Sequence, residues 1–512
     1  MTKRLDSSLQ QSLEDKCGIL GIHSLTPKLN FPIALLAAAG LQHRGQHGAG
    51  ITMQTDKGLK WYAGNGLLKN AFPKKMIKDF TVPSLWTMVH LRYGTSGDYV
   101  RHNLQPIRAM APNGDEVFVI HNGEFPAIDK LRSQFPGKKI PKGASDTYLF
   151  THILARQSGN TWDEKILKAL DSVTGAYSLI IGVNDCLYFI RDPWGIRPLI
   201  LGKIADDSWI AASETHAFSK INIKAIRRLK RGEVLKIDKN GPKTIREGNA
   251  KPGNFCDFEW AYFSRPNSQA PTRENDSDLS YSKDWISFSL FRKRCGEALA
   301  KEVKIPSASF VVGVPDSGVA FSTGYAYGAQ IPYAQVILRD HFDPAGLQRL
   351  FMRDDQISLI SQKVLGKLSL VPDSQVWEGA IVVIGDDSIV RGNVSKRITK
   401  AIFDLGAREV HWIIGFPPVA YPCHLGVSMR SREELIAAQF NSDPKKIAKA
   451  IGATSVNYIS PEAFIKARKQ SSNIVHPENP KEIFLANGGC AGCITGLYPV
   501  AKDGSVYPRY TS

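Results

Sequence analysis

The feature that most constrains the fold is an alternation of helical stretches with buried strands between residues 285 and 470. ASFVVGVPDSG, GAIVVIGDDSIVRGN and EVHWIIGFPP each read as an apolar strand that enters a loop, and each follows a helical stretch. Strands that alternate with helices form parallel sheets, because a parallel connection needs a crossover. The second half of the chain is therefore expected to be an α/β domain whose ligands bind at the carboxyl ends of the strands.

Residues 17–262 show another pattern, in which short β-type runs such as VFVIHNG, YSLIIGV and CLYFIRD are separated by Gly and Pro turns. Residues 264–284 are rich in Ser, Asn, Asp and Pro, which predicts a linker or an exposed loop. We therefore expect a polar leader, a first domain, a second domain and an irregular tail. The expected boundaries are 1–16, 17–262, 263–470 and 471–512.

Composition narrows the class of protein. With 512 residues, 43% of them hydrophobic, the chain is long enough for more than one globular domain. Its net charge of +17 favours anionic partners, but the basic residues are dispersed and no nucleic-acid motif is present, so phosphorylated metabolites fit better than nucleic acid. No apolar run is long enough to span a membrane and the N-terminus lacks a secretory signal, so we expect a cytoplasmic protein.

Residues 380–393 predict a site for a sugar phosphate. An apolar strand ends in Asp386 and Asp387, a small-residue turn follows, and a helix then begins. Turn amides and a helix N-terminus bind phosphate, and carboxylates accept hydrogen bonds from ribose hydroxyls. The turn PDSG, residues 315–318, repeats this arrangement one βα unit upstream and would suit a second anion such as pyrophosphate, although alone it is ordinary turn chemistry.

These segments resemble a known family. GDDSIVRG is similar to the phosphoribosylpyrophosphate signature of type I phosphoribosyltransferases, and with FPPVAYPCHLGVSMRSREELIA downstream it resembles the glutamine phosphoribosylpyrophosphate amidotransferases. The resemblance implies a type I phosphoribosyltransferase fold and Mg²⁺ near Asp386 and Asp387. The residues that it assigns to phosphoribosylpyrophosphate are Pro315, Asp316, Ser317, Gly318, Arg339, Asp386, Asp387, Ser388, Ile389, Val390, Arg391, Gly392 and Asn393.

The first half carries the partner domain of this resemblance. CGILGI, LQHRGQHGAGI, HLRYGTSG, NLQP, HNGE, SDT, TGAYSLII, RDPWGIRPL and AASE resemble, in order, an N-terminal-nucleophile glutaminase domain, which implies an αββα sandwich. By the same resemblance Cys17 is the nucleophile, and Asn122 and Gly123 form the oxyanion hole. Arg92 would bind the α-carboxylate of glutamine, and Asp146 would bind its α-ammonium group.

The nucleophile Cys17 needs a base to take its proton. Its own α-amine would serve, since such amines titrate near ~7.7–8.0, but only after residues 1–16 have been removed as a propeptide. Some members of the family have such a propeptide. The alternative is an untrimmed leader, with Cys17 acting as a small hydrophobic residue of the core.

Seven cysteines in a chain without a signal argue against a disulfide framework. Cys256, Cys423 and the CAGC pair Cys490 and Cys493 have the ligand number of a four-iron cluster or of zinc, although isolated cysteines are often inert core residues. The resemblance implies a structural 4Fe–4S cluster, as in the iron–sulfur branch of the family. Cys186 and Cys295 are expected to be ordinary buried thiols.

Departures from the family pattern gather in the second half. In LRDHFDPAGLQRLFM, residues 338–352, Arg339 replaces a lysine and His341 an arginine, while Asn393–Val394 replaces a Thr pair.

The first hypothesis is a complete enzyme of purine synthesis that makes 5-phosphoribosylamine, pyrophosphate and glutamate. The alternatives are a paralogue with another ammonia acceptor and a regulatory homologue without phosphoribosyl transfer. The resemblance also implies a homodimer or homotetramer and purine nucleotides as inhibitors.

Overall fold

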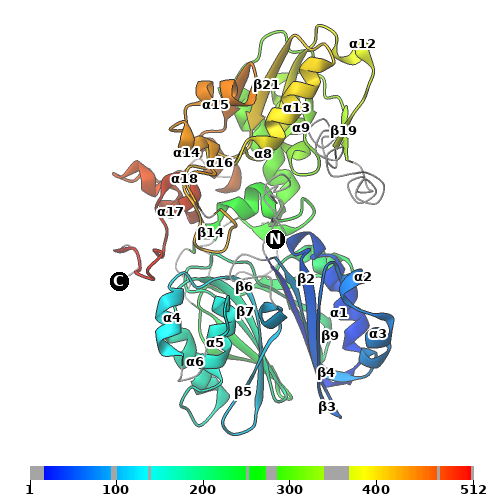
Figure 1. The fold of residues 1–512 in the computed structure, drawn as a ribbon, viewed down its shortest axis with the longest axis vertical. Helices are drawn as coiled ribbons and strands as arrows, with labels where there is room; N and C mark the ends of the chain where they lie inside the picture. The colour runs from blue at the N-terminus through cyan, green and yellow to red at the C-terminus, as the bar shows by residue number, and fades with distance from the viewer. Residues whose placement is uncertain are drawn as a thin grey trace, which may run out of the picture.

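Two antiparallel sheets stack face to face in the first half of the chain (Figure 1). The computed structural model describes residues 17–93, 101–135, 140–248, 253–272, 285–339, 368–429, 431–469 and 473–508. The first sheet has the order β11 (Ala225–Arg228), β9 (Ile200–Ala205), β10 (Ser208–Ala212), β1 (Gly18–Lys28), β4 (Ser84–Arg92), β2 (Gly48–Thr55) and β3 (Gly58–Asn65). The second has the order β13 (Gly241–Arg246), β12 (Val234–Asp238), β8 (Cys186–Arg191), β7 (Ala176–Val183), β6 (Glu116–Glu124) and β5 (Ile107–Met110).

Helices cover the outer face of each sheet, which gives the predicted αββα sandwich (Figure 1). The first sheet is covered by α1 (Asn30–Ala39), α2 (Leu68–Ala71) and α3 (Lys74–Phe80), and the second by α4 (Ile128–Gln134), α5 (Asp146–Leu154) and α6 (Trp162–Asp171). Between the sheets, Trp86, Phe118 and Phe189 belong to one buried cluster. Because both faces are covered, a central strand such as β7 is buried at every residue, which explains its continuous apolar run.

A four-stranded parallel sheet forms the second half, as the alternation of helices and strands predicts. Its order is β17 (Phe310–Gly313), β20 (Ile381–Asp386), β21 (Glu409–Ile414) and β22 (Ser455–Tyr458). One face packs on α8 (Phe288–Glu302), α9 (Gly318–Ala329) and α16 (Pro461–Lys469), and the other on α13 (Asn393–Asp404) and α15 (Pro444–Ile451). The predicted fold class is confirmed for both halves.

Short paired segments join the two halves. β14 (Phe255–Cys256) pairs in parallel with β23 (Gly489–Cys490), so the tail returns to the region that links the two halves, here called the joint (Figure 1). β15 (Gln269–Pro271) pairs with β16 (Trp285–Ser287). The segment predicted as a linker or an exposed loop begins inside the protein, because Ser264 and Ser268 are buried and use their hydroxyls as hydrogen-bond donors. Residues 273–284 lie outside the described residues.

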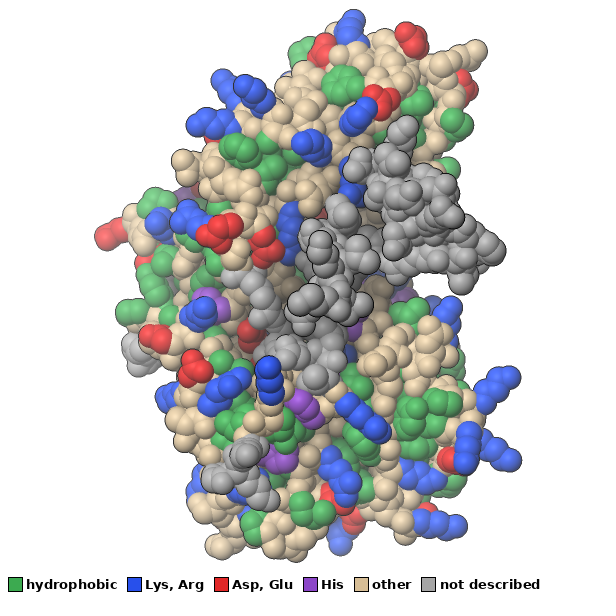
Figure 2. All heavy atoms as spheres, viewed as in Figure 1, with side chains coloured by type: hydrophobic (Ala, Val, Ile, Leu, Met, Phe, Trp, Pro, Cys, Tyr) green, Lys and Arg blue, Asp and Glu red, His purple; other side chains and the backbone are tan. Residues whose placement is uncertain are grey.

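The surface agrees with a dispersed positive charge. Figure 2 shows Lys and Arg side chains scattered over both halves on the face in view, with no single basic patch. Within the described ranges, no helix is long and apolar enough to cross a membrane.

Candidate active site

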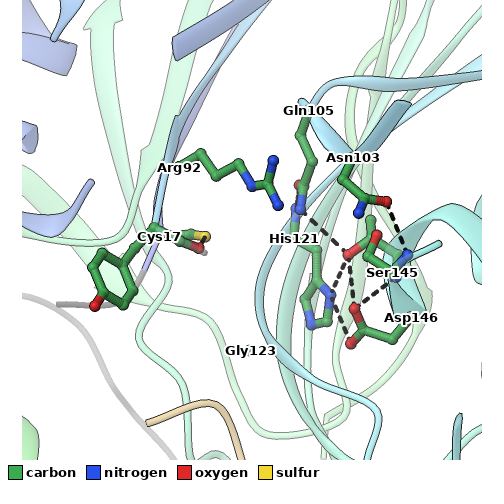
Figure 3. A pocket seen from close by; sticks show the side chains of 10 residues that line it. Cys17, Arg92, Asn103, Gln105, His121, Gly123, Ser145 and Asp146 are labelled. Carbon is green, nitrogen blue, oxygen red and sulfur yellow. Dashed lines mark hydrogen bonds and ion pairs between the residues drawn. The ribbon is translucent and has the colours of Figure 1, made fainter. Parts of the chain in front are cut away.

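A pocket opens where the central strands of the two sheets end (Figure 3). Cys17 comes just before β1, Arg92 ends β4, Gly123 lies near the end of β6 and Asp146 begins α5. The lining residues are Cys17, Arg92, Tyr93, Asn103, Gln105, His121, Gly123, Ser145, Asp146 and Thr147. The structure therefore brings four of the five predicted glutaminase residues to one place, with Cys17 and Arg92 facing Asp146 across the pocket.

Cys17 sits in a buried position that keeps its thiol protonated. Its Sγ lies 3.5 Å from the Tyr93 carbonyl oxygen, and the residue is 7% exposed. Burial raises the pKa of the Cys17 thiol, although the guanidinium groups of Arg92 and Arg44 work in the opposite direction. A thiol with a raised pKa is a weak nucleophile at neutral pH, so catalysis at this position requires a base.

Asp146 is held in one orientation by backbone donors. Its Oδ2 accepts a hydrogen bond from the Phe125 amide at 2.9 Å, and its Oδ1 accepts one from the Thr147 amide at 2.8 Å. His121 lies beside it, with Nδ1 3.8 Å from Asp146 Oδ2 and 3.0 Å from Thr147 Oγ1. Burial lowers the pKa of His121, so its imidazole stays neutral beside Asp146.

The two residues predicted for the oxyanion hole are neighbours on β6, and Gly123 lines the pocket. Asn122 Nδ2 donates to Ser213 Oγ at 3.5 Å, and among the described residues its Oδ1 has no hydrogen-bond partner. Ser213 Oγ also accepts from the Ile19 amide at 3.1 Å, so the Asn122 side chain lies toward the strand that follows Cys17. The Asn122 amide carries two N–H donors, so its bond to Ser213 does not prevent it from donating to a ligand.

Several lining residues have no role assigned from the sequence, although each lies in a quoted motif. Gln105 Oε1 accepts from the His121 amide at 2.6 Å, and Gln105 Nε2 donates to Thr147 Oγ1 at 3.3 Å. Asn103 Oδ1 accepts from the Ser145 amide at 2.9 Å. These bonds fix the far wall of the pocket. These residues lie in the motifs NLQP and SDT, from which their place at the pocket could have been predicted.

A buried charge network lies behind Cys17. Arg44 ends a short 3₁₀ turn (Gln42–Arg44), and its Nε donates to the Cys17 carbonyl oxygen at 3.4 Å. Its Nη1 lies 2.6 Å from Glu214 Oε1, and its Nη2 lies 2.7 Å from Glu259 Oε1. Burial alone would raise the pKa of Glu214, but His43 and Arg44 hold it well below its usual range. Cys17 is thus positioned through its backbone by charges that water does not reach.

In the second half, the two predicted anion turns lie side by side at the carboxyl ends of β17 and β20. A Cβ added to Gly318 would lie 2.5 Å from the Gly385 carbonyl oxygen, so the turn containing Pro315, Asp316 and Ser317 touches the strand that ends at Asp386. Ser388 Oγ donates to Asp387 Oδ1 at 2.7 Å. Burial raises the pKa of Asp386 and of Asp387, and for Asp386 the neighbouring carboxylate adds to the effect.

The turn after Asp387 offers mainly its backbone. Ile389 and Val390 are buried, and the Val390 carbonyl oxygen accepts from the Ile436 amide at 2.9 Å. Arg391 Nε donates to Glu434 Oε2 at 2.9 Å, so this guanidinium is engaged inside the protein. Gly392 directly precedes α13, whose first residue, Asn393, is exposed.

Part of the predicted transferase loop can be placed. Arg339, the last described residue of β18 (Ile337–Arg339), forms an ion pair with Asp316 of the PDSG turn. It therefore lies beside the site to which it was assigned. The rest of the altered loop, residues 340–352, lies outside the described residues.

The four candidate ligand cysteines gather at the joint between the halves. Cys256 and Cys490 are register partners on β14 and β23, and the Cys493 carbonyl oxygen accepts from the Tyr421 amide at 3.0 Å. Burial raises the pKa of all four thiols, and the charge of neighbouring cysteines adds to the rise for Cys423, Cys490 and Cys493. In the described part of the chain, no three His, Cys, Asp or Glu side chains are arranged to hold a metal ion.

The other two cysteines differ in exposure. Cys295 is fully buried, as predicted, whereas Cys186 at the start of β8 is only half-buried. It lies where the β7–β8 turn reaches the surface, which a strand-forming motif alone does not show.

Comparisons with known proteins agree with this geometry. A sequence model of the glutamine amidotransferase domain matches residues 90–220, so the first half is a glutamine amidotransferase domain. The chain is 32% identical to the amidophosphoribosyltransferase of Bacillus subtilis, with 96% of this chain and 95% of that protein covered. It is 30% identical to the human amidophosphoribosyltransferase, with 96% and 98% covered. The chain belongs to the amidophosphoribosyltransferase family.

Solved structures give the same result. The B. subtilis glutamine phosphoribosylpyrophosphate amidotransferase complexed with ADP and GMP superimposes with a TM-score of 0.79 at 31% identity, covering 94% of this chain and 97% of the other. A structure described as the allosteric regulatory enzyme of purine biosynthesis superimposes with a TM-score of 0.80 at 31% identity, covering 96% and 97%. Both halves of the chain therefore have counterparts in the family.

Proposed function

We propose that the protein is a glutamine-dependent amidophosphoribosyltransferase of the first step of purine synthesis. It converts glutamine, water and phosphoribosylpyrophosphate into glutamate, pyrophosphate and 5-phosphoribosylamine. The observation that carries the proposal is that one chain, similar to this family over nearly its whole length, holds Cys17, Arg92 and Asp146 in one pocket and the turns at residues 315–318 and 386–393 at one sheet edge.

The first half supplies ammonia. Cys17 Sγ attacks the side-chain carbonyl carbon of glutamine, and the α-amine freed by removal of residues 1–16 takes the thiol proton. The raised pKa of the thiol supports the need for that amine. The C–N bond then breaks, the leaving nitrogen takes the proton and departs as ammonia, and water hydrolyses the thioester to glutamate. Arg92 and Asp146 bind the α-carboxylate and α-ammonium groups.

The second half uses the ammonia. The nitrogen of ammonia attacks C1 of phosphoribosylpyrophosphate, the C–O bond to pyrophosphate breaks, and a proton leaves the new amine. Asp386 and Asp387 hold the ribose hydroxyls, and the amides of residues 388–393 hold the 5′-phosphate. The turn at residues 315–318 and Arg339 would hold the pyrophosphate, and Asp386 and Asp387 would hold Mg²⁺, which would neutralise part of its charge.

We also propose that Cys256, Cys423, Cys490 and Cys493 hold a 4Fe–4S cluster, as in the propeptide-containing branch of the family. The four cysteines suit an iron–sulfur cluster as ligands, because none forms a disulfide and the charges of Cys256, Cys423 and Cys490 all act on the Cys493 thiol. Bound there, the cluster would be a structural crosslink between the joint, the second half and the tail.

The remaining assignments follow the family. We propose domains at 17–262 and 263–470, a cluster-binding tail at 471–512, a cytoplasmic location, a homodimer or homotetramer, and inhibition by purine nucleotides. The last is supported by the B. subtilis relative, whose structure is described as complexed with ADP and GMP.

The test uses anaerobically purified protein whose N-terminus has been sequenced. Glutamate and pyrophosphate are measured with and without phosphoribosylpyrophosphate and Mg²⁺. Equal amounts of both products are expected, and Cys17→Ala should abolish them with glutamine but not with ammonia. Cys186→Ala, a half-buried cysteine far from the pocket, is the control. Glutamate without pyrophosphate would overturn the transferase assignment and indicate another ammonia acceptor. Neither product from trimmed, iron-loaded protein would indicate a regulatory homologue.

A further inference from the structure

A loop of the second half reaches into the glutaminase domain and touches the strand that carries Gly123. Gly426, between Cys423 and Met429, is buried and has φ +99°. A Cβ added at Gly426 would lie 3.0 Å from the Gly123 carbonyl carbon and 3.1 Å from its Cα. The two backbones are therefore in direct contact, and an added Cβ would also lie 3.1 Å from Arg197 Nη2, so a side chain at position 426 would force these neighbours to shift. The positive φ of Gly426 also favours glycine there.

Gly123 is confined from its other side as well. It has φ +147°, and a Cβ there would lie 1.9 Å from the Ala176 carbonyl oxygen of β7. The Gly123 backbone thus lies between a neighbouring strand of its own sheet and a loop from the other half of the chain. Both contacts restrict the Gly123 backbone, which is itself only half-buried.

The same loop is tied to the network behind Cys17. Arg197 is fully buried, and its Nη2 donates to the Leu425 carbonyl oxygen. Its Nη1 lies 3.7 Å from Glu259 Oε1. Glu259 in turn pairs with Arg44, whose Nε donates to the Cys17 carbonyl oxygen. One loop therefore contacts Gly123 directly and connects through buried charges to the backbone of Cys17.

We propose that Gly426 is a positioning residue for glutamine hydrolysis, which braces the Gly123 peptide so that its N–H stays directed at the oxygen that becomes negative when Cys17 attacks. The inference rests on the proposed function, in which Gly123 belongs to the oxyanion hole. Such donors act by being fixed before the reaction, so a small displacement weakens binding of the transition state more than binding of the substrate. The brace acts on kcat rather than on KM for glutamine.

The experiment compares Gly426→Ala with Gly58→Ala in the full, trimmed protein. Gly58 has φ +101°, and no atom of the described residues lies within 4 Å of an added Cβ, so its substitution brings the same backbone strain without a collision. For Gly426→Ala we expect a loss of kcat for glutamine hydrolysis of about 10–100-fold, less than the full loss of a donor. KM for glutamine should change less than about twofold, because substrate binding does not use the oxyanion hole. Gly58→Ala should match the wild type in both.

A second readout separates positioning from general damage. The aldehyde analogue of glutamine forms a thiohemiacetal with Cys17, whose oxygen would occupy the oxyanion hole, whereas glutamate forms no such adduct. Gly426→Ala should weaken binding of the aldehyde by the same factor by which it lowers kcat. It should leave glutamate binding and ammonia-dependent synthesis unchanged. Arg197→Lys shortens the side chain and weakens its bond to the Leu425 carbonyl oxygen, so it should show the same pattern to a smaller extent even if Gly426→Ala does not fold.

The results distinguish the two levels of the proposal. The brace is overturned if Gly426→Ala behaves like Gly58→Ala, if both variants at 426 and 197 raise KM with kcat unchanged, or if aldehyde and glutamate binding weaken equally. A wild-type protein without glutamine hydrolysis, or one whose hydrolysis survives Cys17→Ala, would instead contradict the proposed function itself.

Discussion

Arg44 and Glu259 form a bidentate ion pair in which neither side chain has any exposed surface. Nη2 lies 2.7 Å from Oε1, and Nη1 lies 3.0 Å from Oε2. Arg44 belongs to the glutaminase half, and Glu259 begins the one-turn π-helix Glu259–Phe263 that leads into the second half. The contact fixes the joint between the halves and, through the Cys17 carbonyl, the position of the nucleophile.

Removing one charge of this pair should destabilise the protein strongly. Glu259→Gln leaves a buried guanidinium with less compensation, and we expect a loss of about 3–5 kcal/mol in the free energy of unfolding. The control is Asp404→Asn, which breaks the exposed pair of Asp404 with Lys400 and should cost less than about 1 kcal/mol. Urea unfolding measures both. Equal shifts for the two variants would contradict the role given to Glu259.

His90 should make the protein less stable in acid. Burial, with the charge of Arg92, lowers the pKa of His90 to about 3. Below the ordinary pKa of histidine, His90 binds a proton in the unfolded chain but not in the folded protein. The free energy of unfolding therefore falls by about 1.4 kcal/mol per pH unit as pH falls from about 6.5 towards 3. Between pH 7 and pH 5, His90→Gln should therefore lose about 2 kcal/mol less than the wild type. Urea midpoints at the two pH values test this, and identical losses would count against it.

Gly392→Ala should damage the phosphate turn. Gly392 has φ +77°, and a Cβ there would lie 2.6 Å from Ile436 Cδ1, whereas Gly379 has φ +69° and no atom within 4 Å. Gly379→Ala should cost only the backbone strain of about 1–2 kcal/mol. Gly392→Ala should cost about 1 kcal/mol more and raise KM for phosphoribosylpyrophosphate. If the two variants have the same KM, the start of α13 does not bind the phosphate.

Asp386→Asn and Asp387→Asn should each impair only the transferase half. Hydrogen bonds to charged groups are worth about 1.5–3 kcal/mol, so kcat/KM for phosphoribosylpyrophosphate should fall by about 10–100-fold. Glutamine hydrolysis without phosphoribosylpyrophosphate should stay within about twofold of the wild type, since these residues lie at the far sheet edge. Steady-state release of pyrophosphate and glutamate gives both values. A matching fall in hydrolysis would show that these aspartates serve the first half too.

The second half could be predicted well because its strands are buried on both faces. β17, β20 and β21 each read as a continuous apolar run, and all three are present. β22 was missed because its four residues, SVNY, include two polar side chains. Among the described strands it pairs with β21 alone, at the edge of the sheet, so it needs less apolar surface than a central strand.

The site could be predicted only in part, for two physical reasons. Alternation along a strand sends the His121 side chain to Asp146 and the Asn122 side chain to Ser213, which a motif read as a unit does not reveal. Glu259 could not be found at all. Its partner Arg44 lies far away in the sequence, and a contact made only by tertiary folding leaves no local pattern.

The pairing of β14 with β23 sets the order in which the molecule can be completed. Cys256 and Cys490 meet in register, yet almost the whole second half of the chain lies between them. During synthesis on the ribosome, Cys256 emerges long before Cys490 exists, so β14 cannot pair with β23 until residue 490 has been made. A chain that stops before Cys490 would therefore lack this link between the start of the second half and the tail.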